Sequence, residues 1–134
     1  MDRDRGRSIR VGRGDPMEKG IQTTVATALG AVLLLVGIVG FLTEPAILWF
    51  QINSVHNVVH LLAGAIGVWA GVWGGIVAAR WFNRVFGIVY ALVAVLGFLN
   101  VQAVWSLLNL NDADNWLHTV IGVGQLIVGF GMKD

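Results

Sequence analysis

The sequence predicts an all-α membrane protein with four transmembrane helices, built as two tandem helical hairpins with both termini in the cytoplasm. Its 134 residues are 56% hydrophobic and only 13% charged, about half the charged share of an average soluble domain. The apolar residues fall into four long stretches, and the basic residues lie on one side of them. A chain this short would need more charge to cover its surface in water, so a soluble globular domain is nearly excluded.

Residues 1–20 form a polar segment for which we expect a disordered basic tail. The segment combines six basic residues with four acidic residues and four glycines. It therefore cannot bury enough apolar surface to offset the entropy cost of ordering. Met17 lies within it and is a second candidate start of translation beside Met1.

Residues 21–134 are expected to form a single transmembrane domain. The four apolar stretches cover residues 21–42, 55–79, 85–99 and 116–132. At about 1.5 Å per residue, the second stretch crosses a hydrocarbon core of about 30 Å with some tilt. The third and fourth stretches are shorter, and adjoining residues extend them at the interfaces.

The basic residues predict the orientation of the helices. Outside the tail, they are Arg80, Arg84 and Lys133. The two opposite linkers, 43–54 and 100–114, contain no Lys or Arg and carry acidic residues instead: Glu44, Asp112 and Asp114. Because basic residues are retained in the cytoplasm, we expect both termini on the cytoplasmic side of the cell membrane. The opposite linkers are rich in apolar residues, so we expect short interfacial helices or turns there.

The two halves of the chain match each other. Residues 30–42 read GAVLLLVGIVGFL and residues 87–99 read GIVYALVAVLGFL, with seven of thirteen positions identical. Residues 52–64, INSVHNVVHLLAG, match residues 110–122, LNDADNWLHTVIG. Each half has an even number of crossings, so the repeats are parallel and related by a pseudo-twofold axis along the membrane normal. Repeat one covers about residues 21–79 and repeat two about residues 80–132.

Polar residues gather near the outer ends of the second and fourth predicted helices. At about 100° per residue, His56 and His60 share one face of the second helix with a row of small residues. This row holds Gly64, Gly67, Gly71 and Gly75. The fourth helix repeats the arrangement with Asp114, His118, Gly122, Gln125 and Gly129. Small residues at this spacing let helices approach closely, so we expect the histidines to point into the protein. Tyr90 and Gln125 are expected to pack against or hydrogen-bond neighbouring helices.

Three interpretations of these polar residues remain open. The favoured one is a structural cap in which four asparagines satisfy helix starts and linker carbonyls. These asparagines are Asn53, Asn57, Asn111 and Asn115. The second interpretation is a metal or haem site with His60 and His118 as ligands, assisted by His56 and Asp114. The third is a proton-sensitive or ion-conducting site built from the same ionisable groups.

The sequence contains no recognisable catalytic set. It has no cysteine, and no phosphate loop, dinucleotide fingerprint or Ser/His/Asp set can be assembled, so we do not expect an enzyme. The favoured function is a small structural or accessory subunit that packs against other membrane helices or a second copy. The alternative is a small channel or transporter, or a metal- or haem-binding protein using His60 and His118. No particular cofactor is indicated, and besides such subunits only the lipid bilayer, not nucleic acid, is expected as a partner.

Three segments resemble a known family: NSVHNVVHLLAG, GIVYALVAVLGF and LNLNDADNWLHTVIG. They are similar to the small four-helix integral membrane proteins of domain-of-unknown-function family forty-three eighty-three, found in bacteria and archaea. The resemblance covers about residues 20–132. Its motifs are HNxxH, at His56, Asn57 and His60, and ADNxLH, at Ala113, Asp114, Asn115 and His118. The resemblance implies a four-helix membrane protein and brings no known activity, substrate or cofactor.

Overall fold

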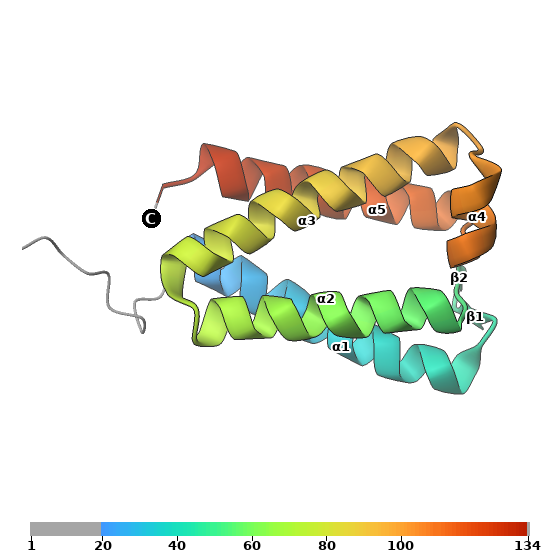
Figure 1. The fold of residues 1–134 in the computed structure, drawn as a ribbon, viewed down its shortest axis with the longest axis horizontal. Coiled ribbons are helices and arrows are strands. Elements are labelled where there is room, and N and C mark those ends of the chain that lie inside the picture. The colour runs from blue at the N-terminus through green and yellow to red at the C-terminus, as the bar shows by residue number, and fades with distance from the viewer. Residues whose placement is uncertain (1–19, 134) are drawn as a thin grey trace, which may run out of the picture.

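The computed structural model describes residues 20–133, and most of them are helical (Figure 1). The long helices are α1 (Ile21–Thr43), α2 (Ser54–Val72), α3 (Gly75–Phe98) and α5 (Asp112–Leu126), which continues as a π-helix, η1 (Ile127–Gly131). The linkers hold strands β1 (Ala46–Ile47) and β2 (Phe50–Gln51), which pair antiparallel, and the short helix α4 (Gln102–Leu108). The predicted tail lies outside the described residues except for Gly20.

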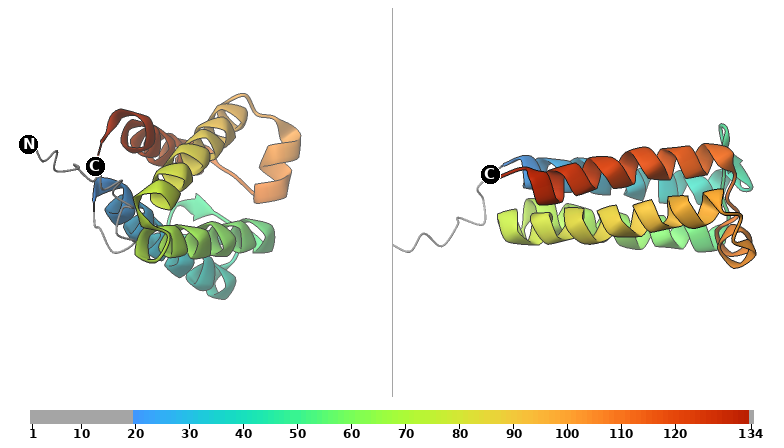
Figure 2. Two further views of the ribbon diagram at one scale, coloured as in Figure 1. Left: turned by 60° about the vertical axis from the view of Figure 1, so that its left-hand side comes forward. Right: turned by 90° about the horizontal axis from the view of Figure 1, so that it is seen from above.

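The long helices form two hairpins that lie side by side. Helix α1 packs along α2, and α3 packs along α5, while α3 also contacts both helices of the first hairpin. The start of α1, the turn between α2 and α3, and the end of η1 lie at one end of the bundle (Figures 1 and 2). The β-hairpin and α4 lie at the other end. We call these the terminal end and the linker end.

Three helices in the described part of the chain, α1, α2 and α3, are long and apolar enough to cross a membrane. Many large apolar side chains on these helices point outward; Leu35 on α1, for example, is 62% exposed. A bundle surrounded by lipid exposes such side chains without the cost they would have in water. The helical, membrane-type fold class predicted from composition is therefore confirmed at this level.

The boundary between the second and third helices differs from the sequence prediction. Helix α2 ends at Val72 and α3 begins at Gly75, whereas the apolar stretches predicted helices over 55–79 and 85–99. The chain turns at Gly74 and Gly75, and Gly75 has φ of 70°. Glycine adopts this backbone conformation readily because it lacks a Cβ atom. Hydropathy did not reveal the turn, because the apolar residues continue through it.

This shifted boundary corrects two further expectations. Gly75 is the first residue of α3, so it does not continue the row of small residues on α2. Arg80 and Arg84, which fall between the second and third apolar stretches and so were expected outside the helices, lie in the first turns of α3.

The fourth helix begins earlier than the apolar stretch at 116–132 indicates, because the polar residues from Asp112 onward are helical.

The predicted packing glycines bring the helices of each hairpin together. A Cβ on Gly64 of α2 would lie 2.6 Å from the backbone nitrogen of Leu34 on α1. In the second hairpin, a Cβ on Gly122 of α5 would lie 2.7 Å from the backbone nitrogen of Ala91 on α3. These contacts leave no room for a side chain. The other members of the set also face neighbouring parts of this chain: Gly67 faces Phe82, Gly71 faces Thr27 and Gly129 faces Arg84.

At the terminal end, polar side chains connect the two hairpins. The amide nitrogen of Gln22 on α1 donates to the carbonyl of Val128 in η1 at 2.7 Å. The amide nitrogen of Asn83 on α3 donates to the side-chain oxygen of Gln22 at 2.9 Å, and Nε of Arg84 donates to the carbonyl of Gly129 at 2.7 Å. Gln22 and Arg84 thus donate to carbonyls at the end of the last helix, which has no further turn to pair with, and Asn83 holds Gln22 in place.

Candidate functional site

The linker end is built on two asparagines that begin α2 and α5. Oδ1 of Asn53 accepts a hydrogen bond from the backbone nitrogen of His56 at 2.9 Å. Oδ1 of Asn111 accepts one from the backbone nitrogen of Asp114 at 3.0 Å. Both asparagines are therefore N-caps, each satisfying one of the backbone donors that a helix start leaves unpaired.

The same two asparagines tie the hairpins together. Nδ2 of Asn53 donates to the carbonyl of Leu107 in the second half at 3.0 Å, and Nδ2 of Asn111 donates to the carbonyl of Trp49 in the first half at 2.8 Å. Nδ2 of Asn109 adds a bond to the carbonyl of Ile52 at 3.0 Å. The two linkers are thereby held across each other, above the ends of α2 and α5.

Asn57 and Asn115 lie one turn further into the helices and are fully buried. The side chain of Asn57 occupies the space beside Gly40, and that of Asn115 the space beside Gly97. Nδ2 of Asn57 donates to the Glu44 carboxylate at 2.9 Å. The amide of Asn115 has no hydrogen-bond partner among the described residues.

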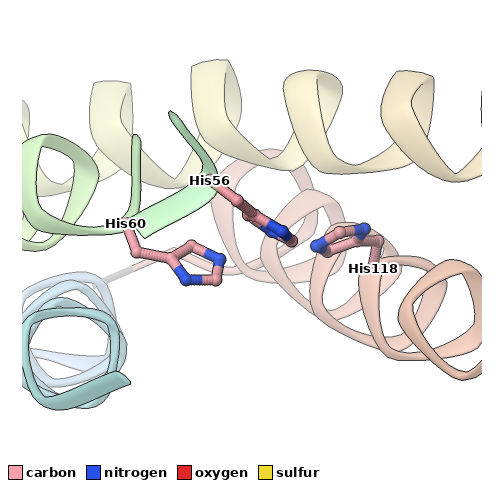
Figure 3. Close-up of side chains that lie close together, drawn as sticks. All are labelled: His56, His60 and His118. Carbon is pink, nitrogen blue, oxygen red and sulfur yellow. The ribbon is translucent and has the colours of Figure 1, made fainter. Parts of the chain in front are cut away.

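His56, His60 and His118 come together between the hairpins. All three side chains are buried, and one ring nitrogen from each lies within 4.8 Å of the others. The ring of His56 lies between the other two (Figure 3), with centroids 4.4 Å from His60 and 5.7 Å from His118. Nδ1 of each ring is buried without a hydrogen-bond partner among the described residues. A buried polar atom without a partner costs about 1–3 kcal/mol, so three of them in one place are a feature that needs a cause.

Asp114 lies beside this cluster but is not one of its three converging groups. Its Oδ2 accepts hydrogen bonds from the backbone nitrogens of Asn111 at 2.9 Å and Gln51 at 3.2 Å. In the alignment of the two halves, Asp114 takes the position of His56. The carboxylate therefore anchors the linker end, while His56 contributes the imidazole that has no counterpart in the second half.

A cavity of about 270 Å³ opens beside the histidines. Its walls come mainly from apolar side chains of α1, α5 and the β-hairpin, including Leu33, Ile47 and Ile121. All three histidines, Asp114 and Tyr90 also line it. The Tyr90 ring lies 5.4 Å from that of His118, and its hydroxyl is buried without a hydrogen-bond partner in the described part of the chain.

The structure places the predicted polar residues together at the linker end, but it arranges the histidines differently from the sequence interpretation. The sequence interpretation paired His60 with His118 and made His56 an assistant, whereas the structure places His56 at the centre of the group. It expected Tyr90 to pack against or bond a neighbouring helix, and gave no sign that Tyr90 would contact His118 beside a cavity. Sequence spacing alone cannot show this contact, because the two residues lie on different helices.

Fold and site together define a helical membrane-type protein with a buried polar cluster at one end of its bundle. The chain belongs to the family described as domain of unknown function (DUF4383), whose model matches residues 23–131. This match confirms the resemblance that the two motifs indicate. No curated protein and no solved structure matches the chain.

Proposed function

We propose that this chain is a four-span membrane protein that binds one transition-metal ion, of the zinc or copper class, at His56, His60 and His118. The observation that carries the proposal is the convergence of three buried imidazoles whose Nδ1 atoms have no partner among the described residues. A bound metal ion would give these buried ring nitrogens a partner.

The spacing of the rings is close to that of a metal centre. Metal–nitrogen bonds of about 2.0–2.1 Å place tetrahedral ligand nitrogens about 3.4 Å apart. The ligand atoms here lie within 4.8 Å of one another, so small side-chain rotations bring them into place. Three protein ligands leave a fourth position open, as in catalytic rather than structural zinc sites.

The ligand types define the class of metal. Neutral imidazole suits zinc, copper, iron and nickel, whereas magnesium and calcium prefer oxygen ligands. A dication in an apolar interior also needs a nearby negative charge. Asp114 lines the same cavity as the three histidines, so its carboxylate is the described acidic group that could supply this charge.

A haem held between His60 and His118 is a poorer fit, because the His56 ring occupies the space between them (Figure 3). The accessory-subunit role stays a prediction, but one of its arguments is weaker. The glycine rows that favoured partner helices are used for contacts within this chain.

Three observations support four spans built from a duplicated hairpin. Helix α5 continues into η1, so a single helical segment runs from Asp112 to Gly131. Gly64 meets the backbone of Leu34, as Gly122 meets that of Ala91, and these pairs occupy matching positions in the two halves. The described basic residues, Arg80, Arg84 and Lys133, lie toward the terminal end, which supports a cytoplasmic location for both termini.

The metal content of the purified protein tests the proposal. We expect about one zinc or copper ion per chain by mass spectrometry of the purified full-length protein, and a loss of most of it in His60→Ala and His118→Ala. Gln125→Leu is the matched control, because Gln125 is a buried polar residue of α5 two turns away from His118. The proposal is contradicted if the wild-type protein contains no metal. It is also contradicted if the histidine variants contain as much metal as Gln125→Leu.

A further inference from the structure

An apolar groove runs between α1 and α5, from the histidines toward the terminal end. A second cavity, of about 390 Å³, lies between the same two helices next to the cavity beside the histidines. Leu29, Val32 and Ile121 line both cavities, so the two are neighbouring parts of one groove. Val32 is 54% exposed on the outer face of the bundle, so the groove borders the lipid.

Apart from the histidines and Asp114 at one end, the groove has few polar residues, and these are neutral and buried. Tyr90 lines the groove at its histidine end, and Gln125 lines it about 10 Å further along α5, at 1.5 Å per residue from His118. Neither the Tyr90 hydroxyl nor the Gln125 amide has a hydrogen-bond partner among the described residues. Long apolar walls with a few hydrogen-bonding groups are typical of sites for lipophilic small molecules.

The charges near the groove indicate whether the polar head of a lipophilic ligand would be charged or neutral. The described basic side chains, Arg80, Arg84 and Lys133, do not line it, and the carboxylate of Asp114 lies at its histidine end. A phosphate head would meet a negative charge there without a cation to pair with. A hydroxyl and an amide instead suit a neutral head that carries carbonyl or hydroxyl oxygens.

We propose that the groove binds a membrane-dissolved molecule of the isoprenoid-quinone class, with its apolar chain between α1 and α5 and its oxygen-bearing head beside Tyr90 and the histidines. The inference rests on the proposed function in one respect, since the head lies where the open coordination position of the metal would face. A second copy of the chain is a poorer occupant, because the polar residues of the groove, Tyr90 and Gln125, are buried below the surface that another helix would contact.

A quinone probe tests this assignment. The full-length protein, in nanodiscs of phosphatidylcholine, is titrated with decylubiquinone, and bound quinone is measured by chromatography and mass spectrometry. We expect saturable binding of one molecule per chain, and no comparable binding of dodecyl phosphate, whose chain is similar but whose head is charged. Equal binding of the two probes, or preference for the phosphate, overturns the assignment.

Two matched substitutions on α1 locate the binding site. Val32→Trp fills the groove from an exposed position, and we expect quinone affinity about tenfold lower because the bulky ring occupies the ligand's space. Leu35→Trp is the control: it lies on the same helix at similar exposure and lines neither cavity, so we expect wild-type affinity. Equal affinities for the two variants overturn the groove as the binding site.

Metal content, measured on the same samples, separates this inference from the proposed function. We expect Val32→Trp to keep its metal ion while its affinity for the quinone falls about tenfold. A protein that binds metal but no quinone overturns only the groove assignment. A protein that binds quinone in a Val32-dependent way but contains no metal supports the groove and overturns the metal centre.

Discussion

Asn53 and Asn111 make the same two interactions in the two halves of the chain. Each caps a helix through Oδ1, and each donates Nδ2 to a carbonyl in the opposite linker, that of Leu107 or that of Trp49. Because the two carbonyls also occupy matching positions in the repeats, the bonds form a reciprocal pair across the bundle. This pair fixes the ends of α2 and α5 relative to each other, and with them the histidines.

Loss of either asparagine should destabilise the linker end. We expect Asn53→Ala and Asn111→Ala each to lower the free energy of unfolding by about 1–2 kcal/mol, since each removes an N-cap and leaves a carbonyl in the other linker unpaired. Thermal unfolding in detergent measures the change. Gln102→Ala is the control, because its exposed bond to Ser106 should contribute less than about 0.5 kcal/mol. A control variant as unstable as the asparagine variants would argue against this role.

The glycine contacts inside the hairpins predict a second set of stability changes. Gly64→Ala and Gly122→Ala each force a methyl group against the backbone of the facing helix, and we expect a loss of about 1–3 kcal/mol from overpacking. Gly124→Ala should be neutral or stabilising, because a Cβ there meets nothing within 4 Å. Equal melting temperatures for the three variants would show that these close contacts do not limit the packing.

Metal binding at the histidines should stabilise the fold. A ligand that binds only the folded state at 100 times its dissociation constant adds about 2.7 kcal/mol. We therefore expect zinc or copper to raise the melting temperature of metal-free protein, and a chelator to reverse the rise. His118→Ala should melt at the same temperature with and without the metal. A metal-dependent rise that persists in this variant would place the ion elsewhere.

The orientation of the helices can be read from engineered cysteines, because the natural chain has none. We expect a membrane-impermeant maleimide to label Leu48→Cys and Asp112→Cys in intact cells, since both residues lie at the linker end. Lys133→Cys, at the terminal end, should be labelled only after the membrane is permeabilised. If only Lys133→Cys is labelled in intact cells, the orientation is the opposite of the one proposed. If Leu48→Cys and Lys133→Cys are both labelled in intact cells, the two ends of the bundle are not on opposite sides of the membrane, which contradicts four spans.

Helix positions could be predicted only as far as apolar composition changes along the chain. The stretch at 21–42 is followed by polar residues, and α1 ends there within one residue of the prediction. At Gly74 and Gly75 the composition does not change, because the turn depends on backbone conformation at a residue without a side chain. The helix boundary was therefore misplaced at this turn.

The candidate site shows the same division. A three-residue or four-residue spacing places two side chains on one helical face, so the sequence could group His56 with His60 and predict that both point inward. The sequence could not show that the side chain of His56, rather than that of Asp114, would lie next to His118. That choice depends on the backbone amides of Asn111 and Gln51, which hold the Asp114 carboxylate at the linker end.

The sequence by itself determined the membrane-type helical class, the family and the residues that gather at the linker end, because hydropathy, charge and motif spacing are properties of neighbouring residues along the chain. Only the tertiary structure decided that the three histidine rings converge, that Tyr90 lies against His118, and that α1 and α5 enclose an apolar groove beside them. Those features depend on how closely separate helices approach, and glycine contacts and linker hydrogen bonds set that distance.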